Sequence, residues 1–147
     1  MELNKEIYTE YDGDYHGQKL AKVFWFFLKN EIKGPVLDLG AGNGVIIDLL
    51  TSKGIKDVKG IDLAPKHPLI EKGDITNLPF EDESFETVIM TEVIEHLDDQ
   101  QIEKTLKEIN RVLKKNGKLI LTTPYKEVFN NNVVCCPNCK TKFHRYG

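Results

Sequence analysis

The expected fold is decided by the stretch Val36-Leu37-Asp38-Leu39-Gly40-Ala41-Gly42-Asn43-Gly44. Its first four residues form a short, nearly continuous apolar run, which is typical of a strand buried on both faces of a parallel sheet. The glycines that follow let the backbone approach a ligand closely. Val45–Leu50 is then predicted to form a helix that ends at Lys53-Gly54. A buried strand that runs through a glycine loop into a helix predicts an α/β protein with a ligand near the helix N-terminus.

The periodicity of apolar residues predicts further elements on both sides of this stretch. Ahead of it, Leu20–Leu28 has the apolar stripe of a helix, which ends before Gly34-Pro35. After it, strands are predicted at Val58–Leu63, Ile70–Ile75, Glu86–Thr91 and Lys118–Thr123. Between the last two strands, a helix starts at Asp98-Asp99 and carries Ile102, Leu106, Ile109 and Leu113 on one face, before a left-handed stop or turn at Asn116-Gly117. This order predicts a mostly parallel sheet in an α/β layer structure.

The composition is that of one globular domain and excludes several classes of protein. The chain has 147 residues, of which 40% are hydrophobic and 29% are charged. Twenty basic against 23 acidic residues give a net charge of −3, which argues against a nucleic-acid binder that acts through bulk charge. The apolar run Val23–Leu28 is far shorter than the roughly 20 residues of a membrane span, and the N-terminal residues lack a secretion signal. We therefore expect neither membrane association nor secretion.

The three cysteines, Cys135, Cys136 and Cys139, lie together near the C-terminal end. Such a cluster cannot cross-link the rest of the chain, so we expect a hydrophobic core to hold the fold and the location to be reducing and cytoplasmic. Cys136 and Cys139 with His144 are similar to a zinc knuckle, because two thiolates at this spacing can bind one zinc ion. A disordered tail and a redox pair are the alternatives, since a structural zinc ion requires four ligands.

A carboxylate stands at the tip of the second predicted strand. Asp62 follows Gly40 by 22 positions, where it can accept hydrogen bonds from both hydroxyls of a ribose. The site is therefore expected to take an adenosine-containing cofactor. A dinucleotide is the rival ligand, but its fingerprint requires glycine or alanine where this chain has Val45, and the Asp38 carboxylate would repel a pyrophosphate. A glycine-rich turn without a ligand is the remaining alternative.

Between Gly34 and Pro124, the motifs resemble those of the class I S-adenosylmethionine-dependent methyltransferases, of the type 11 kind, in order and spacing. The matching segments are the glycine stretch quoted above, Gly60–Leu63, Gly73–Ile75, Leu78–Phe80, Ser84–Glu86, Glu92–Leu97 and Leu119–Pro124. The resemblance implies a Rossmann-like sheet with flanking helices and S-adenosylmethionine as the cofactor.

On the methionine side of the cofactor, the resemblance implies a role for each matching residue. The loop would wrap the methionine portion with Gly40, Ala41, Gly42, Asn43 and Gly44. Asp38 would lie near the ammonium or the sulfonium group, and Thr91 would lie near the methyl-bearing sulfur.

On the adenosine side, the resemblance implies four further contacts. Asp62 would hold the ribose, and Leu63 would pack beside the adenine. Asp74 would accept a hydrogen bond from the adenine amino group, and the backbone N–H of Ile75 would bind the ring.

Two departures from the family pattern affect the expected architecture. Only ten residues separate Asp62 from Gly73, and two of them are prolines, so the usual helix between these strands cannot form. Only 23 residues follow Pro124, too few for the helix and the two strands with which the fold normally continues. The sheet is therefore expected to lack its usual last strands, and its open edge suggests a homodimer. The expected divisions are an N-terminal helical cap (1–33), the α/β core (34–124) and a Cys/His-containing tail (125–147).

Glu92, Glu95 and His96 follow the fourth predicted strand and combine two carboxylates with an imidazole. Oxygen and imidazole donors at this spacing suit Mg²⁺, Mn²⁺ or Zn²⁺. This stretch looks like that of small-RNA 2′-O-methyltransferases and some ubiquinone-pathway O-methyltransferases, in which these positions bind a divalent metal. The alternatives are that His96 is a general base near the acceptor, or that the stretch only begins a loop.

The leading hypothesis for the function is a methyltransferase that transfers a methyl group from S-adenosylmethionine to a small molecule, with oxygen as the favoured acceptor atom. The sulfonium is already an activated donor, so such an enzyme mainly aligns the acceptor and excludes water. The rival is a truncated, non-catalytic module that binds the cofactor or a partner chain. A nucleotide-binding oxidoreductase is a weaker third hypothesis.

Overall fold

The computed structural model describes residues 24–124, 133–135 and 142–144. Five parallel strands form one sheet in the order β3-β2-β1-β4-β5. The strands are β1 (Val36–Leu39), β2 (Val58–Asp62), β3 (Ile70–Lys72), β4 (Phe85–Thr91) and β5 (Leu113–Thr122). The predicted sheet is therefore confirmed, although β3 is shorter than the predicted strand at Ile70–Ile75.

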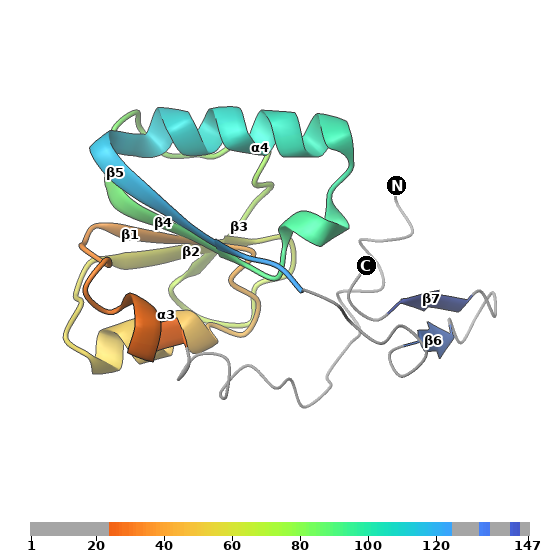
Figure 1. The fold of residues 1–147 in the computed structure, drawn as a ribbon, viewed down its shortest axis with the longest axis horizontal. Coiled ribbons are helices and arrows are strands. Elements are labelled where there is room, and N and C mark those ends of the chain that lie inside the picture. The colour runs from red at the N-terminus through yellow and green to blue at the C-terminus, as the bar shows by residue number, and fades with distance from the viewer. Residues whose placement is uncertain (1–23, 125–132, 136–141, 145–147) are drawn as a thin grey trace.

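Helices lie on both faces of this sheet, with α4 (Asp99–Val112) along one face and α3 (Val45–Ser52) against the other (Figure 1). Residues 24–28 are also helical, as far as the predicted helix at Leu20–Leu28 is described. A short 3₁₀ helix, η1 (Ile94–His96), follows β4, and β6 (Val133–Cys135) pairs antiparallel with β7 (Lys142–His144). Within the described part of the chain, no helix combines the length and the apolar character that a membrane crossing requires.

Two hydrophobic clusters follow from the alternation of side chains along the strands. Leu37 and Leu39 of β1 belong to the cluster under α4, together with Ile109 and Val112 of that helix. Val36 belongs to the cluster under α3, which also contains Ile47, Leu50, Val58, Ile70, Ile89 and Ile120. All four residues of β1 are buried, as expected for the central strand of a sheet that is covered on both faces.

Helix α4 begins as predicted and buries part of the predicted face. Asp98 is its N-cap and forms a capping box with Gln101, which satisfies two backbone N–H groups at the helix start. The buried residues are Thr105, Ile109 and Val112, whereas Leu106 is 43% exposed. Of the residues predicted to share one face of this helix, Ile109 is therefore buried, whereas Leu106 lies outward. Leu113 already belongs to β5, where it is partly buried against the core under α4.

The connection into β5 contains the predicted left-handed turn. Asn116 has a φ of 67°, and Gly117 lies so close to the Lys114 carbonyl that an added Cβ would be 2.9 Å from it. Leu113 pairs with Phe85, and the regular pairing with β4 resumes at Lys118. The intervening residues bulge out of the sheet, so that the turn lies inside β5 rather than at the end of a helix. Among the described residues, no strand pairs with the outer edge of β5.

Thr87 connects the centre of β4 to the segment that leads into β1. Its side chain is fully buried, and its hydroxyl donates to the Lys33 carbonyl (2.7 Å) and accepts from the Lys33 N–H (3.0 Å). Thr87→Val keeps the shape of the side chain but leaves both Lys33 groups without this partner. We expect T87V to lower the free energy of unfolding by about 2 kcal/mol, measured by urea denaturation.

The matched control is Thr87→Ser, which keeps the hydroxyl and removes one methyl group. We expect T87S to lose about 1 kcal/mol or less. A T87V protein that is as stable as the wild type would show that the hydroxyl does not hold the two segments together.

Candidate functional site

The glycine loop connects the carboxyl end of β1 to the start of α3, as predicted. The backbone N–H groups of Gly40 and Ala41 both donate to the Ile61 carbonyl of β2, at 2.9 and 3.2 Å. Gly44 is the N-cap of α3 in the left-handed conformation, and no side chain caps the helix. The loop is therefore fixed at its base, while N–H groups in the first turn of α3 have no side-chain partner and can face a ligand.

Each of the three loop glycines has a positive φ, but their surroundings differ. A Cβ on Gly40 would be 2.5 Å from Val93, and a Cβ on Gly44 would be 2.6 Å from the ring of His67. A Cβ on Gly42 would meet no atom within 4 Å. Gly40 and Gly44 are therefore required for close packing within the protein, whereas the space beside Gly42 is open to a ligand.

Asp62, at the end of β2, binds backbone on two sides. Its Oδ2 accepts from the Gly42 N–H at 2.9 Å, and its Oδ1 accepts from the Ala64 N–H at 2.8 Å. A carboxylate has about four lone-pair sites, so each oxygen can accept one more hydrogen bond. The contact with Gly42 ties the second strand to the glycine loop.

Asp38 is the buried acid of the site. Its side chain lies on the α3 face of the sheet, between the register neighbours Gly60 of β2 and Ile89 of β4. Asp38 is 2% exposed, and its Oδ1 has no hydrogen-bond partner. Burial, and secondarily the nearby Asp62 carboxylate, raise the pKa of Asp38 to about 8. The ionised form of this carboxyl group therefore lacks a positively charged or hydrogen-bonding partner that would stabilise it.

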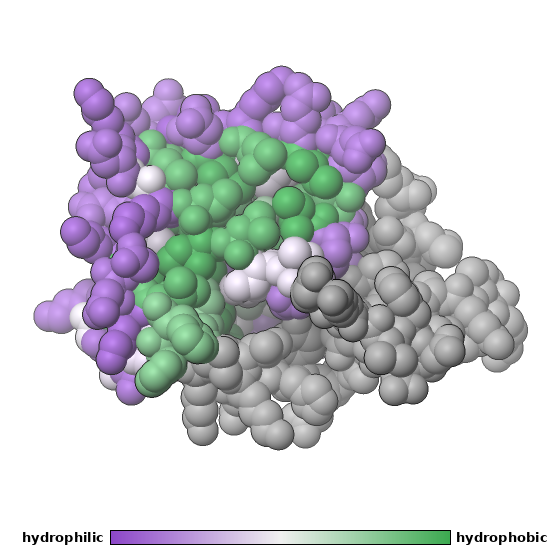
Figure 2. All heavy atoms as spheres, in the orientation of Figure 1, coloured by the Kyte–Doolittle hydropathy of each residue, from purple (hydrophilic) through white to green (hydrophobic). Residues whose placement is uncertain are grey.

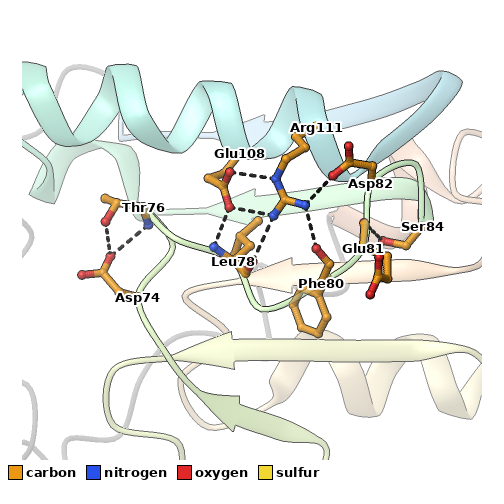
Figure 3. Close-up of polar contacts among 9 residues, drawn as sticks. All are labelled: Asp74, Thr76, Leu78, Phe80, Glu81, Asp82, Ser84, Glu108 and Arg111. Atoms are coloured by element: carbon orange, nitrogen blue, oxygen red, sulfur yellow. Dashed lines mark hydrogen bonds and ion pairs between the residues drawn. The ribbon is translucent and has the colours of Figure 1, made fainter.

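The residues predicted for the adenosine side lie beyond the ends of β2 and β3. Leu63, directly after β2, is 40% exposed. Asp74 accepts from the Thr76 N–H and hydroxyl through Oδ1, at 2.9 and 2.8 Å (Figure 3). Ile75 is buried in the core under α4. The Gly73 N–H donates to the Asp62 carbonyl at 2.9 Å, which keeps these residues close to β2.

A strained residue follows the end of β4. Thr91 is the last residue of the strand and pairs with Thr122 of β5. Glu92 has a φ of 55°, which a non-glycine residue rarely adopts. Thr122 holds it there, because its carbonyl accepts from the Glu92 N–H (3.1 Å) and its hydroxyl donates to Glu92 Oε1 (2.9 Å). Backbone strain of this kind often accompanies a functional site.

The structure does not support the predicted divalent metal site. Within residues 24–124, no group of three or more His, Cys, Asp and Glu side chains could hold a metal ion. The carboxylates of Glu92 and Glu95 accept from the hydroxyls of Thr122 and Thr123, at 2.9 and 3.5 Å. Burial lowers the pKa of His96 below its ordinary value, so its imidazole is neutral at pH 7. Zinc at the other predicted site would involve Cys136 and Cys139, which lie outside the described residues, and His144, which ends β7 opposite Val133.

The sequence-based analysis missed two residues that shape the glycine loop. Val93 packs against Gly40, and His67 packs against Gly44. His67 Nδ1 accepts from the Leu69 N–H at 3.2 Å, which leaves Nε2 to donate to Asp48 Oδ1 of α3 at 3.1 Å. The prolines on both sides of the Lys66-His67 pair were a usable signal, because they prevent a helix in the connection after β2, which here consists of bends and a turn.

Comparison with known proteins decides the family. The sequence profile of the family described as "Methyltransferase domain" matches residues 37–121, which is more than half of the chain. The chain belongs to the class I S-adenosylmethionine-dependent methyltransferase family. The matched range runs from β1 into β5, so the family core coincides with the five-stranded sheet described above.

Relatives and solved structures agree with this assignment. A demethylmenaquinone methyltransferase from Thermotoga maritima is 33% identical over 97 residues, which are 58% of this chain and 42% of the relative. An uncharacterised methyltransferase from Anoxybacillus flavithermus is 33% identical over 95 residues, 58% of this chain and 44% of the relative. A crystal structure from Pyrococcus horikoshii has a TM-score of 0.64 at 28% identity and covers 78% of this chain and 60% of that chain. The chain therefore spans less than half the length of these two curated relatives.

The open space beside Gly42 gives a test of where the cofactor binds. Gly42 and Gly54 both have a positive φ (51° and 88°), and a Cβ on either would meet no protein atom within 4 Å. Gly42→Ala and Gly54→Ala should therefore each cost the fold about 1 kcal/mol. We expect G42A, but not G54A, to weaken binding of S-adenosylhomocysteine at least tenfold in calorimetric titrations, because only the Gly42 methyl group would enter the cofactor space. Equal affinities of the two variants would place the cofactor elsewhere.

Proposed function

We propose that this protein transfers the methyl group of S-adenosylmethionine to an oxygen atom of a small molecule. The observation that carries the proposal is the Asp38 carboxyl, which is buried without a partner for Oδ1 beside the glycine loop and Asp62. An internal acid of this kind is stabilised by a cationic ligand, and the cofactor has two positive groups, its ammonium and its sulfonium. The family membership supports the same cofactor.

The residues that would hold the cofactor form two groups with different chemistry. On the methionine side, Asp38 supplies negative charge, and the first turn of α3 supplies backbone N–H groups for a carboxylate. On the adenosine side, Asp62 has lone pairs for the ribose, Leu63 presents an exposed apolar surface, and Asp74 carries a carboxylate. When bound, the cofactor supplies an activated methyl group on its sulfonium.

The methyl acceptor would approach from the end of β4, where Thr91 ends the strand and Glu92 and His96 follow within five residues. His96 is neutral at pH 7 because burial lowers its pKa, so it can take the proton that an acceptor hydroxyl loses. Glu92 is fixed by Thr122 and adds a carboxylate to the same end of the sheet. A neutral base near a carboxylate favours an oxygen acceptor with an exchangeable proton. The net charge of −3 favours a small molecule over a nucleic acid.

The second candidate function is a module that binds the cofactor and associates with another chain. The specific observation is the outer edge of β5, which no described strand covers. A hollow of about 510 Å³ runs beside it, lined by Leu28, Glu31 and residues 118–121. Figure 2 shows apolar side chains gathered on this face of the molecule, with hydrophilic ones around them. A second copy of the chain that pairs along β5 would cover this surface, and a dimer in sedimentation analysis would support that arrangement.

The proposed function is tested in two steps. We expect S-adenosylmethionine to bind with a stoichiometry of one in calorimetric titration, and NAD(H) not to bind. We then expect methyl transfer to a hydroxyl compound in a panel of small oxygen, nitrogen and sulfur acceptors, with activity that persists in excess chelator because Glu92 and Glu95 bind threonine hydroxyls. His96→Gln should lower kcat by about 100-fold with little change in cofactor affinity, since it removes only the base.

The outcomes of these steps distinguish the candidates. Cofactor binding without transfer to any acceptor would favour the non-catalytic module. Activity that is lost in chelator and restored by Mg²⁺ or Mn²⁺ would assign a metal to the end of β4. No binding of S-adenosylmethionine would overturn the proposal.

The buried acid predicts that binding of the cofactor depends on pH. The pKa of Asp38 is about 8 in the free protein, so this group is protonated at pH 6.5. A bound cation favours the ionised form and lowers this pKa, so the group releases a proton on binding below pH 8. The affinity for S-adenosylmethionine should therefore rise with pH, by at most tenfold per unit, and level off above about pH 8.

The measurement is calorimetry at pH 6.5 in two buffers with different enthalpies of ionisation, which counts the released protons. Asp38→Asn should bind at least tenfold more weakly and release no proton, because the amide has no charge to offer. Asp57→Asn is the control, since Asp57 is exposed before β2 and should leave both quantities unchanged. Proton release that persists in D38N would assign the effect to another group.

A further inference from the structure

The segment between β3 and β4, residues 73–84, is held against α4 by a charged pair (Figure 3). We call this segment the β3–β4 loop. Glu108 and Arg111 of α4 bind each other through two hydrogen bonds, Nε to Oε1 at 2.9 Å and Nη2 to Oε2 at 2.8 Å. Hydrogen bonding to Arg111 lowers the pKa of Glu108, so the pair is charged at neutral pH. This two-point geometry fixes the plane of the guanidinium group.

The pair binds the backbone of the loop at three points. Glu108 Oε2 accepts from the Leu78 N–H at 2.7 Å, and Arg111 Nη2 donates to the Leu78 carbonyl at 3.0 Å. Arg111 Nη1 donates to the Phe80 carbonyl at 2.7 Å. Both polar groups of the Leu78 backbone are thus bound by the same pair of side chains. The Leu78 side chain is buried in the core at 4% exposure, so the loop is fixed from two directions at this residue.

The other end of the same segment carries the residues assigned to the adenine. The Gly73 N–H is bound by the Asp62 carbonyl, and the Asn77 N–H is bound by the Asp74 carbonyl at 3.0 Å. Thr76 binds the Asp74 side chain through its N–H and its hydroxyl. Residues 74–77 therefore form one tight turn, which is anchored to β2 on one side and to α4 through Leu78 on the other. No helix separates β2 from β3 that could support this turn instead.

We propose that Arg111, together with Glu108, is a positioning residue for the adenine side of the cofactor site. The pair sets the place of the turn that carries Asp74 and Ile75, and so sets how well the protein recognises the 6-amino group of adenine. Neither side chain touches the cofactor in this proposal. It rests on the proposed function, because it assumes that the adenosine portion binds beyond β2 and β3.

Two ligands that differ at one atom group test the proposal. S-adenosylhomocysteine has the 6-amino group, which can donate a hydrogen bond to the Asp74 carboxylate. S-inosylhomocysteine has a carbonyl oxygen at this position. Because this oxygen and the carboxylate both accept hydrogen bonds, they would repel each other. We expect the wild-type protein to prefer S-adenosylhomocysteine at least about tenfold in calorimetric titration. Arg111→Gln and Glu108→Ala should each reduce this preference about fivefold or more, mainly by weakening S-adenosylhomocysteine binding.

Asp82→Asn is the matched control for the loss of an ion pair. Asp82 binds Arg111 Nη1 at 2.8 Å, but its side chain is 75% exposed and the contact does not hold the Leu78 or Phe80 carbonyl. An exposed pair contributes little, so D82N should change the preference less than twofold. Thermal unfolding of each variant shows whether it is folded at the temperature of the titration. If R111Q does not fold, E108A and Arg111→Lys carry the test, because lysine lacks the planar fork that binds the Glu108 carboxylate at two points.

The proposal is overturned if R111Q and E108A weaken both ligands equally, or if they lower the melting temperature and leave the preference unchanged. In either case the pair only stabilises the fold. A wild-type protein that binds both ligands with equal affinity also overturns it, because the turn then does not recognise the adenine. A wild-type protein that binds neither ligand overturns the proposed function itself, which separates the two failures.

Discussion

The hydrogen bond from the Gly42 N–H to the Asp62 carboxylate is the contact on which the rest of the site depends. It joins the loop after β1 to the tip of β2, and it requires the backbone to pass close to a side chain from the neighbouring strand. The loop can make this approach because Gly40, Gly42 and Gly44 all adopt positive φ angles. The Ile61 carbonyl adds two further bonds at the base of the loop. The shape of the site is therefore already set in the protein without a ligand.

The two halves of the site differ in whether the protein itself provides partners for their carboxylate groups. On the adenosine side, Asp62 and Asp74 are bound by backbone groups, and the pair of Glu108 and Arg111 holds the supporting loop. On the methionine side, Asp38 is buried against apolar neighbours, with Asp62 as a repelling charge. Hydrogen bonds thus fix the adenosine side of the site before a ligand binds. On the methionine side, the buried Asp38 carboxyl lacks a positively charged partner, which a cationic ligand would supply. The residues that orient the adenosine portion of the cofactor would then differ from the residue that selects for its positive charge.

The sequence predicted the parts of this structure that depend on local pattern. The strand Val36–Leu39, the glycine loop, the helix start at Asp98-Asp99 and the turn at Asn116 were all visible, because each depends on residue types at fixed spacing. The face of α4 was predicted only in part: Ile109 is buried as the pattern suggests, but periodicity alone does not show that Thr105 lies inward and Leu106 outward. The packing of His67 on Gly44 and the binding of Leu78 by Arg111 join segments that are distant in the sequence, so only the three-dimensional structure shows them.

The structure lends no support to the metal prediction, for a related reason. Glu92, Glu95 and His96 have suitable chemistry and spacing, but the neighbouring β5 brings Thr122 and Thr123 within hydrogen-bonding distance of the two carboxylates. A pattern within one segment cannot include partners that a second segment supplies.

The position of β1 at the centre of an all-parallel sheet also determines when the chain can fold. Its first neighbour, β2, follows it closely along the chain, but its second neighbour, β4, ends only at Thr91. During synthesis, one side of β1 therefore stays without its partner until β4 has left the ribosome, and β4 in turn waits for α4 and β5 to cover it. Assembly of this core is governed by late, long-range contacts, so nucleation is expected to be slow compared with helical proteins of the same size.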